Sequence, residues 1–158
     1  MAKKNNLMIA KLIMFVVAGL GFLTFIMNFI TAKNLDTALT GSNILEDIGK
    51  FGTESTAMAA YSVLQYVTLF AIIAFGILCV LAIASFVFEG LSVKLSKIVG
   101  IVAILLAIVA IICGYVCVGE MSGSIGGHSI GYSLAFGPWY LLIISAVHTL
   151  VAFFAFKK

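Results

Sequence analysis

Charged residues are scarce in this chain of 158 residues, and arginine does not occur at all. Only 9% of the residues are charged, whereas 63% are hydrophobic. A soluble domain contains roughly a quarter charged residues and about half apolar ones. The chain therefore has too few polar side chains to cover a surface in water, and its composition fits a lipid bilayer as solvent.

The long apolar runs contain no aspartate and no glutamate, so paired carboxylates inside a membrane are excluded. The glycine-rich segment 120–137 has neither the GxGxxG nor the GxxxxGK spacing of a phosphate-binding loop. Serine, histidine and aspartate do not come together at one depth of any run. We therefore expect no enzymatic activity and no cofactor.

Four apolar runs are long enough to cross a hydrocarbon core of about 30 Å, which takes roughly 20 residues in a helix. Helix is expected because lipid tolerates no unpaired backbone, and the runs lack the alternation of barrel strands. The runs lie near residues 7–31, 64–88, 98–119 and 138–156. They predict an all-α fold with a single domain over residues 1–158, an integral membrane antiparallel four-helix bundle.

Lysine predicts the orientation of this bundle. Seven lysines flank the runs on one side, where Glu89 is the only acid: Lys3, Lys4, Lys11, Lys94, Lys97, Lys157 and Lys158. By the positive-inside rule, both termini and the loop 89–97 are cytoplasmic, and the loops 32–63 and 120–137 are outside. We expect a multi-pass protein of the plasma membrane.

A cleaved signal peptide ending at Ala32 is the alternative for the first run. The apolar stretch from Leu12 to Ile30 is longer than the usual signal-peptide core of about 7–15 residues. We therefore expect this segment to remain as a membrane span.

The first outer loop contains a helical pattern in SNILEDIGKFG. Asn43 and Glu46 have the spacing of a capping box, and Gly52 is a suitable C-terminal stop. One face would be apolar, and it consists of Ile44, Leu45, Ile48 and Phe51. This pattern predicts a short amphipathic helix that covers the bundle or lies on the membrane surface, with a ligand-docking site as the less favoured reading.

Small residues recur along the third run at alternating steps of four and three. They are Ser96, Gly100, Ala103, Ala107, Ala110, Gly114 and Cys117, and we call them the small-residue seam. A mean step of 3.5 residues keeps such positions on one helix face, where another helix can approach closely. The partner helix belongs either to the same chain or to another copy, and the first is favoured because a four-helix bundle needs such contacts.

Polar side chains within the runs are the remaining candidates for a site. His148 is the ionisable group deepest in a run, and Asn28 and Gln65 lie near the outer ends of theirs, where they could bond each other. Cys113 and Cys117 have the spacing of two metal ligands, but Cys79 and His148 lie at other depths. We therefore expect a candidate intramembrane polar site at His148, Asn28 and Gln65, and no metal.

The layout resembles small tetraspan proteins of the claudin-like kind, which have cytoplasmic termini and a larger first outer loop. The ending GYSLAFGPWYLLIISAVHTLVAFFAF is also similar to the ends of many small bacterial integral membrane proteins. The first loop has no tryptophan and no cysteine pair, and neither outer loop has the CCG motif of tetraspanins. The resemblance therefore implies a layout only and transfers no function or site residue.

These features predict a non-enzymatic structural or interaction protein in contact with membrane lipid and not with nucleic acid. It would assemble through small-residue helix seams into a homo-oligomer or a larger membrane complex. One alternative is a small oligomeric pore or transporter, with a path between protomers lined by His148, Asn28, Ser145 and Thr149. The other is an immunity or accessory subunit that recognises another membrane protein.

Overall fold

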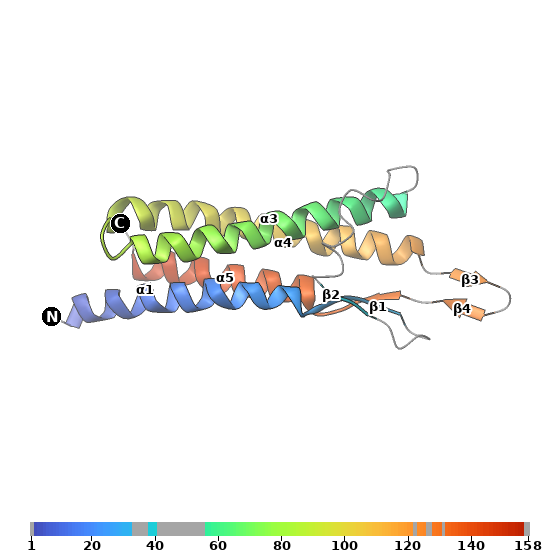
Figure 1. Cartoon of the computed structure of the whole chain (residues 1–158), viewed down its shortest axis with the longest axis horizontal. Helices are drawn as coiled ribbons and strands as arrows, with labels where there is room; N and C mark the ends of the chain where they lie inside the picture. Colours follow the sequence, from blue (N-terminus) through green and yellow to red (C-terminus); the bar gives the residue numbers. More distant parts are fainter. Residues whose placement is uncertain are drawn as a thin grey trace.

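The computed structural model describes residues 2–32, 38–40, 56–121, 123–125, 128–130 and 132–156. Four long helices run side by side along the length of the molecule (Figure 1). They are α1 (Ala2–Leu20), α3 (Thr56–Ala84), α4 (Glu89–Met121) and α5 (Gly137–Ala155). α3 packs against α4, α4 against α5, and α1 against both α3 and α5, so the helices form a closed four-helix bundle.

Successive helices of the bundle point in opposite directions. α1 and α4 run one way in Figure 1, and α3 and α5 run the other way. Buried apolar residues of the four helices form two clusters, one toward each end of the bundle. The first cluster joins Ala10 and Met14 of α1 to Ala82, Val93 and Ala152 of the other helices. The beginning of α1, the α3–α4 turn and the end of α5 therefore lie at the same end, which we call the lysine end.

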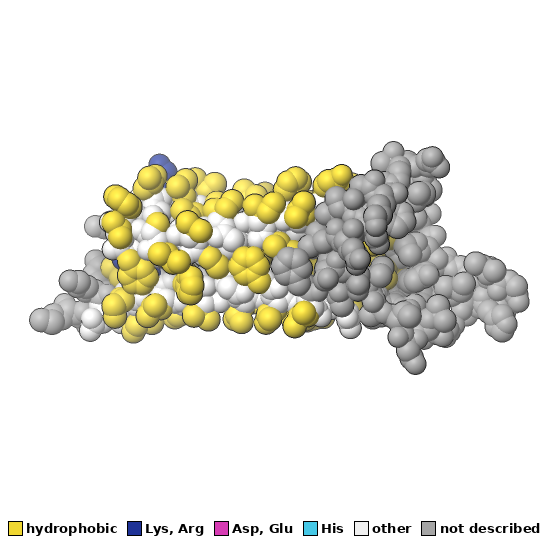
Figure 2. All heavy atoms as spheres, viewed as in Figure 1, with side chains coloured by type: hydrophobic (Ala, Val, Ile, Leu, Met, Phe, Trp, Pro, Cys, Tyr) yellow, Lys and Arg dark blue, Asp and Glu magenta, His cyan; other side chains and the backbone are white. Residues whose placement is uncertain are grey.

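The expectation of four membrane-length helices is confirmed. The apolar spans cover Asn5–Thr24, Ala59–Ala84, Glu89–Val118 and Gly137–Ala155. Apolar side chains also cover the outside of the helical part on the face shown in Figure 2. Because water would not solvate such a surface, the fold is that of a multi-pass membrane protein.

The first helix ends earlier than the apolar run that predicted it. α1 tightens into a 3-10 helix, η1 (Gly21–Phe25), in which the Thr24 hydroxyl donates a hydrogen bond of 2.6 Å to the Gly21 carbonyl. The chain then leaves the helix and forms strand β1 (Asn28–Ala32). The expected helix over residues 7–31 is thus wrong over residues 26–31, where Phe29 and Ile30 favour a strand.

The segment 89–97, expected as a loop, is the beginning of α4 instead. The connection from α3 is a tight turn at residues 85–88, closed by the bond from the Phe88 N–H to the Ala84 carbonyl at 2.7 Å. Ser85 supports the turn with a hydrogen bond of 2.6 Å from its hydroxyl to the Ala82 carbonyl. With 33 residues, α4 is about 50 Å long and extends beyond a hydrocarbon core of about 30 Å.

Short strands occupy the end of the bundle opposite the lysine end (Figure 1). β1 pairs antiparallel with both β2 (Ala38–Thr40) and β5 (Tyr132–Leu134) in a three-stranded sheet. β3 (Gly123–Ile125) and β4 (His128–Ile130) form a separate antiparallel pair. None of these strands was expected: β2, β3, β4 and β5 lie in segments 32–63 and 120–137, which were expected to be loops, and they add a small β element to an otherwise helical fold.

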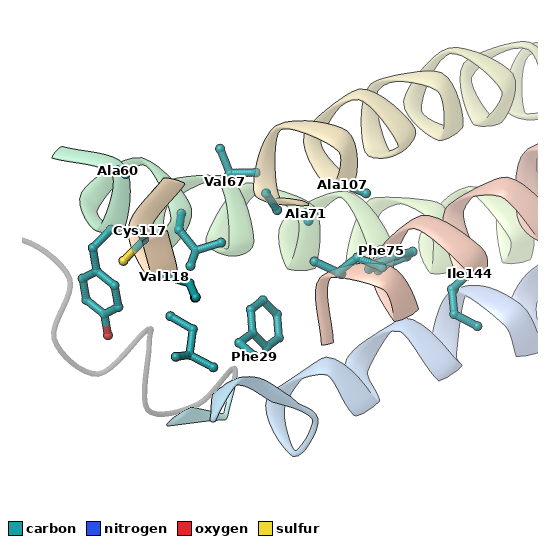
Figure 3. Packing of buried hydrophobic residues seen from close by; sticks show 14 of the residues in the cluster. Phe29, Ala60, Val67, Ala71, Phe75, Ala107, Cys117, Val118 and Ile144 are labelled. Atoms are coloured by element: carbon teal, nitrogen blue, oxygen red, sulfur yellow. The ribbon is translucent and has the colours of Figure 1, made fainter. Parts of the chain in front are cut away.

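The sheet is attached to the bundle by β1. Phe29 and Ile30 are completely buried, and they belong to the apolar cluster that also contains Leu64 of α3 and Val118 of α4. Figure 3 shows the Phe29 ring near Phe75 and Val118, with Ala71 and Ala107 on the neighbouring helices. This larger cluster fills the strand end of the bundle, as Met14 and Ala82 do at the lysine end.

The amphipathic helix predicted around residues 43–52 lies outside the described residues.

Candidate functional site

Every residue of the small-residue seam is buried. The alanines at 103, 107 and 110, together with Ser96 and Cys117, have at most 1% of their surface exposed. The two glycines show why the residues are small. A Cβ atom on Gly100 would lie 2.5 Å from Thr149 Oγ1 of α5. A Cβ atom on Gly114 would lie 2.5 Å from Leu134 Cδ1 of β5. The seam is therefore occupied within one chain.

The face of α5 that meets this seam contains an unusual number of polar residues for a membrane span. Ser145, His148 and Thr149 are all buried there. Ser145 donates a 2.6 Å hydrogen bond to the Leu141 carbonyl, and Thr149 donates a 2.8 Å bond to the Ser145 carbonyl. Both hydroxyls thus satisfy their donor within their own helix, which makes them tolerable in an apolar interior.

His148 is different, because neither of its ring nitrogens has a hydrogen-bond partner among the described residues. Its side chain is completely buried, and Nδ1 lies 3.6 Å from the position that a Cβ atom of Gly100 would occupy. The Ser96 hydroxyl of α4 and the Thr68 hydroxyl of α3 are also buried, and each lacks a partner in the described part of the chain. Among these three side chains, His148 is the only ionisable one.

The three residues of the predicted polar site do not share one environment. Asn28 is exposed in β1, whereas Gln65 is completely buried in α3 and His148 is buried in α5. Asn28 is part of a strand at the bundle end and not of a helix, unlike Gln65 and His148. The geometry leaves His148 as the centre of the candidate site.

The cysteines are spread along two helices. Cys117 is buried, Cys79 and Cys113 are partly exposed, and no disulfide joins any of the three. Within the described residues, no three histidine, cysteine, aspartate or glutamate side chains converge as the ligands of a metal ion would. A closed metal site needs three or four converging ligands.

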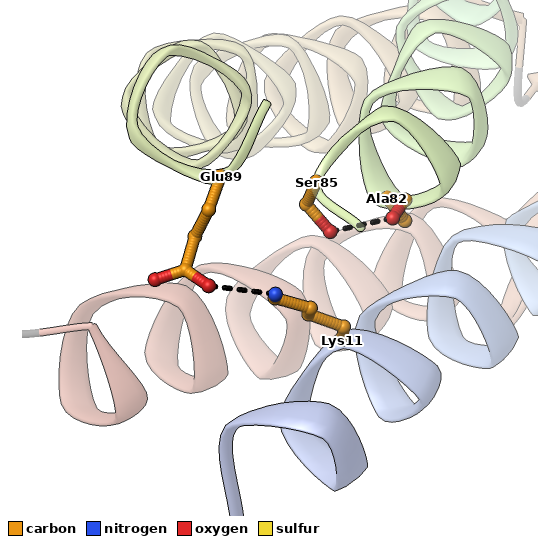
Figure 4. Close-up of polar contacts among 4 residues, drawn as sticks. All are labelled: Lys11, Ala82, Ser85 and Glu89. Carbon is orange, nitrogen blue, oxygen red and sulfur yellow. Dashed lines mark hydrogen bonds and ion pairs between the residues drawn. The ribbon is translucent and has the colours of Figure 1, made fainter. Parts of the chain in front are cut away.

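The lysine end contains interactions that the sequence analysis did not predict. Lys11 of α1 forms a 2.6 Å ion pair with Glu89 in the first turn of α4 (Figure 4). The same ammonium lies 5.4 Å from the centre of the Phe86 ring. Only 11% of the Lys11 side chain is exposed, against 48% of Glu89. The pair holds the α3–α4 turn against α1.

Lys97 makes a second connection at this end. Its Nζ donates a hydrogen bond to the backbone carbonyl of Phe156, the residue that ends α5, and it lies 5.2 Å from the centre of the Phe153 ring. A cation is favourable at a helix C-terminus, because unpaired carbonyls concentrate negative partial charge there. The only sequence signal for either contact is a lysine next to an apolar run, which predicts orientation and not a partner.

No protein-family model, curated protein or solved structure matches this chain. The tetraspan layout is therefore a likeness of arrangement, and the candidate site has to be interpreted from its own geometry. That geometry combines buried small residues along α4, a histidine without a partner among the described residues, and a small sheet at one end. It provides no described group of nucleophile, base and oxyanion donors.

Proposed function

We propose that this chain is a non-enzymatic interaction protein of a plasma membrane, with both termini in the cytoplasm and the sheet outside. The packing of the sheet onto the bundle is the observation that carries the proposal. Phe29 and Ile30 are buried between the sheet and the helices, and the Ala135 N–H donates a 2.8 Å hydrogen bond to the Phe29 carbonyl. A bundle that fixes a sheet in this way is suited to presenting a surface to another protein.

Distribution of charge supports the proposed orientation. Lys11, Lys94 and Lys97 are on helix segments at the lysine end. Lysine is retained on the cytoplasmic side of membrane proteins, so the strand end would face outward.

Assembly with another copy or another membrane protein would use side chains on the outside of the bundle. The small-residue seam is filled by α5 and β5 of the same chain and has no surface to offer. Gly19 of α1, in contrast, is exposed, and no atom lies within 4 Å of the place where its Cβ would be. Outward-facing apolar residues of α1 surround it, including Val16 and Leu20. We propose α1 as the helix that meets a partner.

The test is the assembly state in native lipid. The full chain is crosslinked in the membrane and then extracted with a polymer that keeps native lipid around it. It is expected to migrate as an oligomer or with a co-purifying membrane protein. Gly19→Phe should reduce that assembly, whereas Gly76→Ala, a partly buried position where a Cβ makes only an ordinary 3.7 Å contact, should not. A strictly monomeric protein without any crosslinked partner contradicts the proposal.

A pore between protomers is the alternative that the sequence left open. Its suggested lining included Ser145, His148 and Thr149, which all point into the bundle of a single chain. A path between copies would not reach them, and we therefore favour the interaction protein. Ion flux through proteoliposomes that disappears in His148→Ala would reverse this preference.

A further inference from the structure

Positive charge exceeds negative charge at the lysine end of the bundle. Glu89 is the only acidic side chain in the described residues of this end, and its carboxylate is held by Lys11 in the 2.6 Å ion pair (Figure 4). The helix segments there contain Lys3, Lys4, Lys11, Lys94 and Lys97. The exposed Lys94 ammonium is therefore left without a carboxylate partner among the described residues.

A second lysine lies next to Lys94 on α4. Lys94 and Lys97 are three residues apart, so their side chains leave the helix at neighbouring positions. Lys97 bonds the Phe156 carbonyl, which holds its ammonium where the beginning of α4 meets the end of α5. Two positive charges thus lie within one turn of α4.

Apolar side chains lie directly below this pair of lysines. Ile98 and Ile101 each follow one of the lysines by four residues, which places them one turn deeper on the same side of the helix, and both are exposed. No charged residue occurs between Lys97 and Glu120. Because α4 is longer than a hydrocarbon core is thick, lysines at the start of its apolar stretch can extend their ammonium groups to the level of the lipid phosphates.

We propose that Lys94, with the charge of Lys97 beside it, binds the headgroup phosphate of an anionic phospholipid whose acyl chains lie along Ile98 and Ile101. Basic residues next to a membrane span attract anionic headgroups. A zwitterionic headgroup would add a cation of its own, and the described carboxylate at this end is already paired with Lys11. Such a site needs no protein partner, so it goes beyond the proposed interaction function and does not depend on it.

Native mass spectrometry of the full chain in detergent micelles tests the site. The micelles contain either phosphatidylglycerol or phosphatidylcholine with the same acyl chains. The wild type should retain several-fold more phosphatidylglycerol than phosphatidylcholine. Lys94→Gln should lower the retained phosphatidylglycerol about five-fold, the usual contribution of one lysine near an anionic lipid surface, and Lys94→Arg should restore it.

Lys50→Gln is the matched control, because it removes the same charge from the segment between β2 and α3. It should leave the retained phosphatidylglycerol unchanged. An excess of glycerol phosphate, which has the phosphate without the acyl chains, should not displace the lipid. Equal retention of the two lipids by the wild type overturns the proposal, and so does equal retention of phosphatidylglycerol by Lys94→Gln and Lys50→Gln. Displacement by glycerol phosphate would also overturn it, since the site would then bind phosphate without lipid.

Discussion

At the scale of single residues, the packing of this protein depends more on side-chain volume than on charge. α4 approaches α5 and β5 at glycines and alanines whose replacement would force neighbouring atoms apart. Where helices are already in lipid, such close approach supplies van der Waals contact that the hydrophobic effect cannot supply. Substitutions that change only the volume of a side chain therefore test the fold most sharply.

Ala107→Leu is the first of these substitutions. Ala107 has no exposed surface and lies in the middle of the small-residue seam, so three additional carbon atoms have to displace neighbouring helices. We expect a loss of about 1–3 kcal/mol in the free energy of unfolding, measured by titration with sodium dodecyl sulfate in mixed micelles. Gly90→Leu is the control at an exposed position, where a Cβ meets no neighbouring atom within 4 Å. Equal stability of Ala107→Leu and the wild type would contradict the buried position of the seam.

Gly137→Ala tests the contact between the sheet and the bundle. A Cβ atom there would collide with the Phe29 ring and would lie 2.8 Å from the backbone carbonyl oxygen of Asn28. Because a backbone atom cannot move aside like a side-chain tip, we expect a loss of about 1–3 kcal/mol in the same titration. Gly76→Ala should be neutral or stabilising, since alanine favours helix and its Cβ has room. A Gly137→Ala protein as stable as Gly76→Ala would show that β1 does not pack there.

The sequence pattern of the seam is simpler to interpret than that of the polar site. Periodic small residues define one helix face without any knowledge of the partner, and the structure places all seven in the interior. The surroundings of His148 depend instead on which residue of α4 lies opposite, and Gly100 is 48 positions away in sequence. Helix periodicity contains no information about that register, which is set by contacts between helices.

At the scale of elements, apolar composition predicted the helices well and their ends poorly. An apolar run has the same composition in a helix and in a buried strand, so the change from η1 to β1 was not visible. The first turns of α4 were expected as a loop because they contain Glu89, Gly90 and Lys94. Contacts with other helices stabilise these turns, and the ion pair between Lys11 of α1 and Glu89 of α4 is one of them.

Lys97→Met should loosen the end of α5. The substitution keeps most of the apolar stem and removes the ammonium that bonds the Phe156 carbonyl and contacts the Phe153 ring. We expect the amides of residues 150–156 to exchange with deuterium several-fold faster than in the wild type, measured by mass spectrometry in nanodiscs. Lys94→Met is the matched control, because Lys94 is exposed on the same helix. The same exchange rates in both variants would remove Lys97 as the cause.

Glu89→Gln should destabilise the protein by about 1 kcal/mol, since it leaves the mostly buried Lys11 ammonium without its carboxylate. The double variant Lys11→Met/Glu89→Gln should be less destabilised than the sum of the two single changes, because neither charge is then left alone. A double-mutant cycle from the same unfolding titrations measures this coupling. Additive effects would mean that the pair contributes nothing to the attachment of α1.

At the scale of the whole molecule, alternating helix direction follows from four spans and short connections. The turn at residues 85–88 is so short that α3 and α4 have to be antiparallel neighbours. The closure of the ring by α1 and α5 was not visible in the sequence. It depends on contacts such as the hydrogen bond of 2.6 Å from the Tyr140 hydroxyl to the Leu20 carbonyl, between residues 120 positions apart.

The account stands on a bundle that crosses the membrane four times with its lysine end in the cytoplasm. Thiol labelling of intact cells with a membrane-impermeant reagent tests this directly, in a background with Cys79, Cys113 and Cys117 replaced by alanine. Asn28→Cys at the strand end should be labelled from outside, whereas Asn5→Cys and Gly90→Cys should react only after permeabilisation. Labelling of Asn5→Cys or Gly90→Cys in intact cells, with Asn28→Cys protected, would contradict the account.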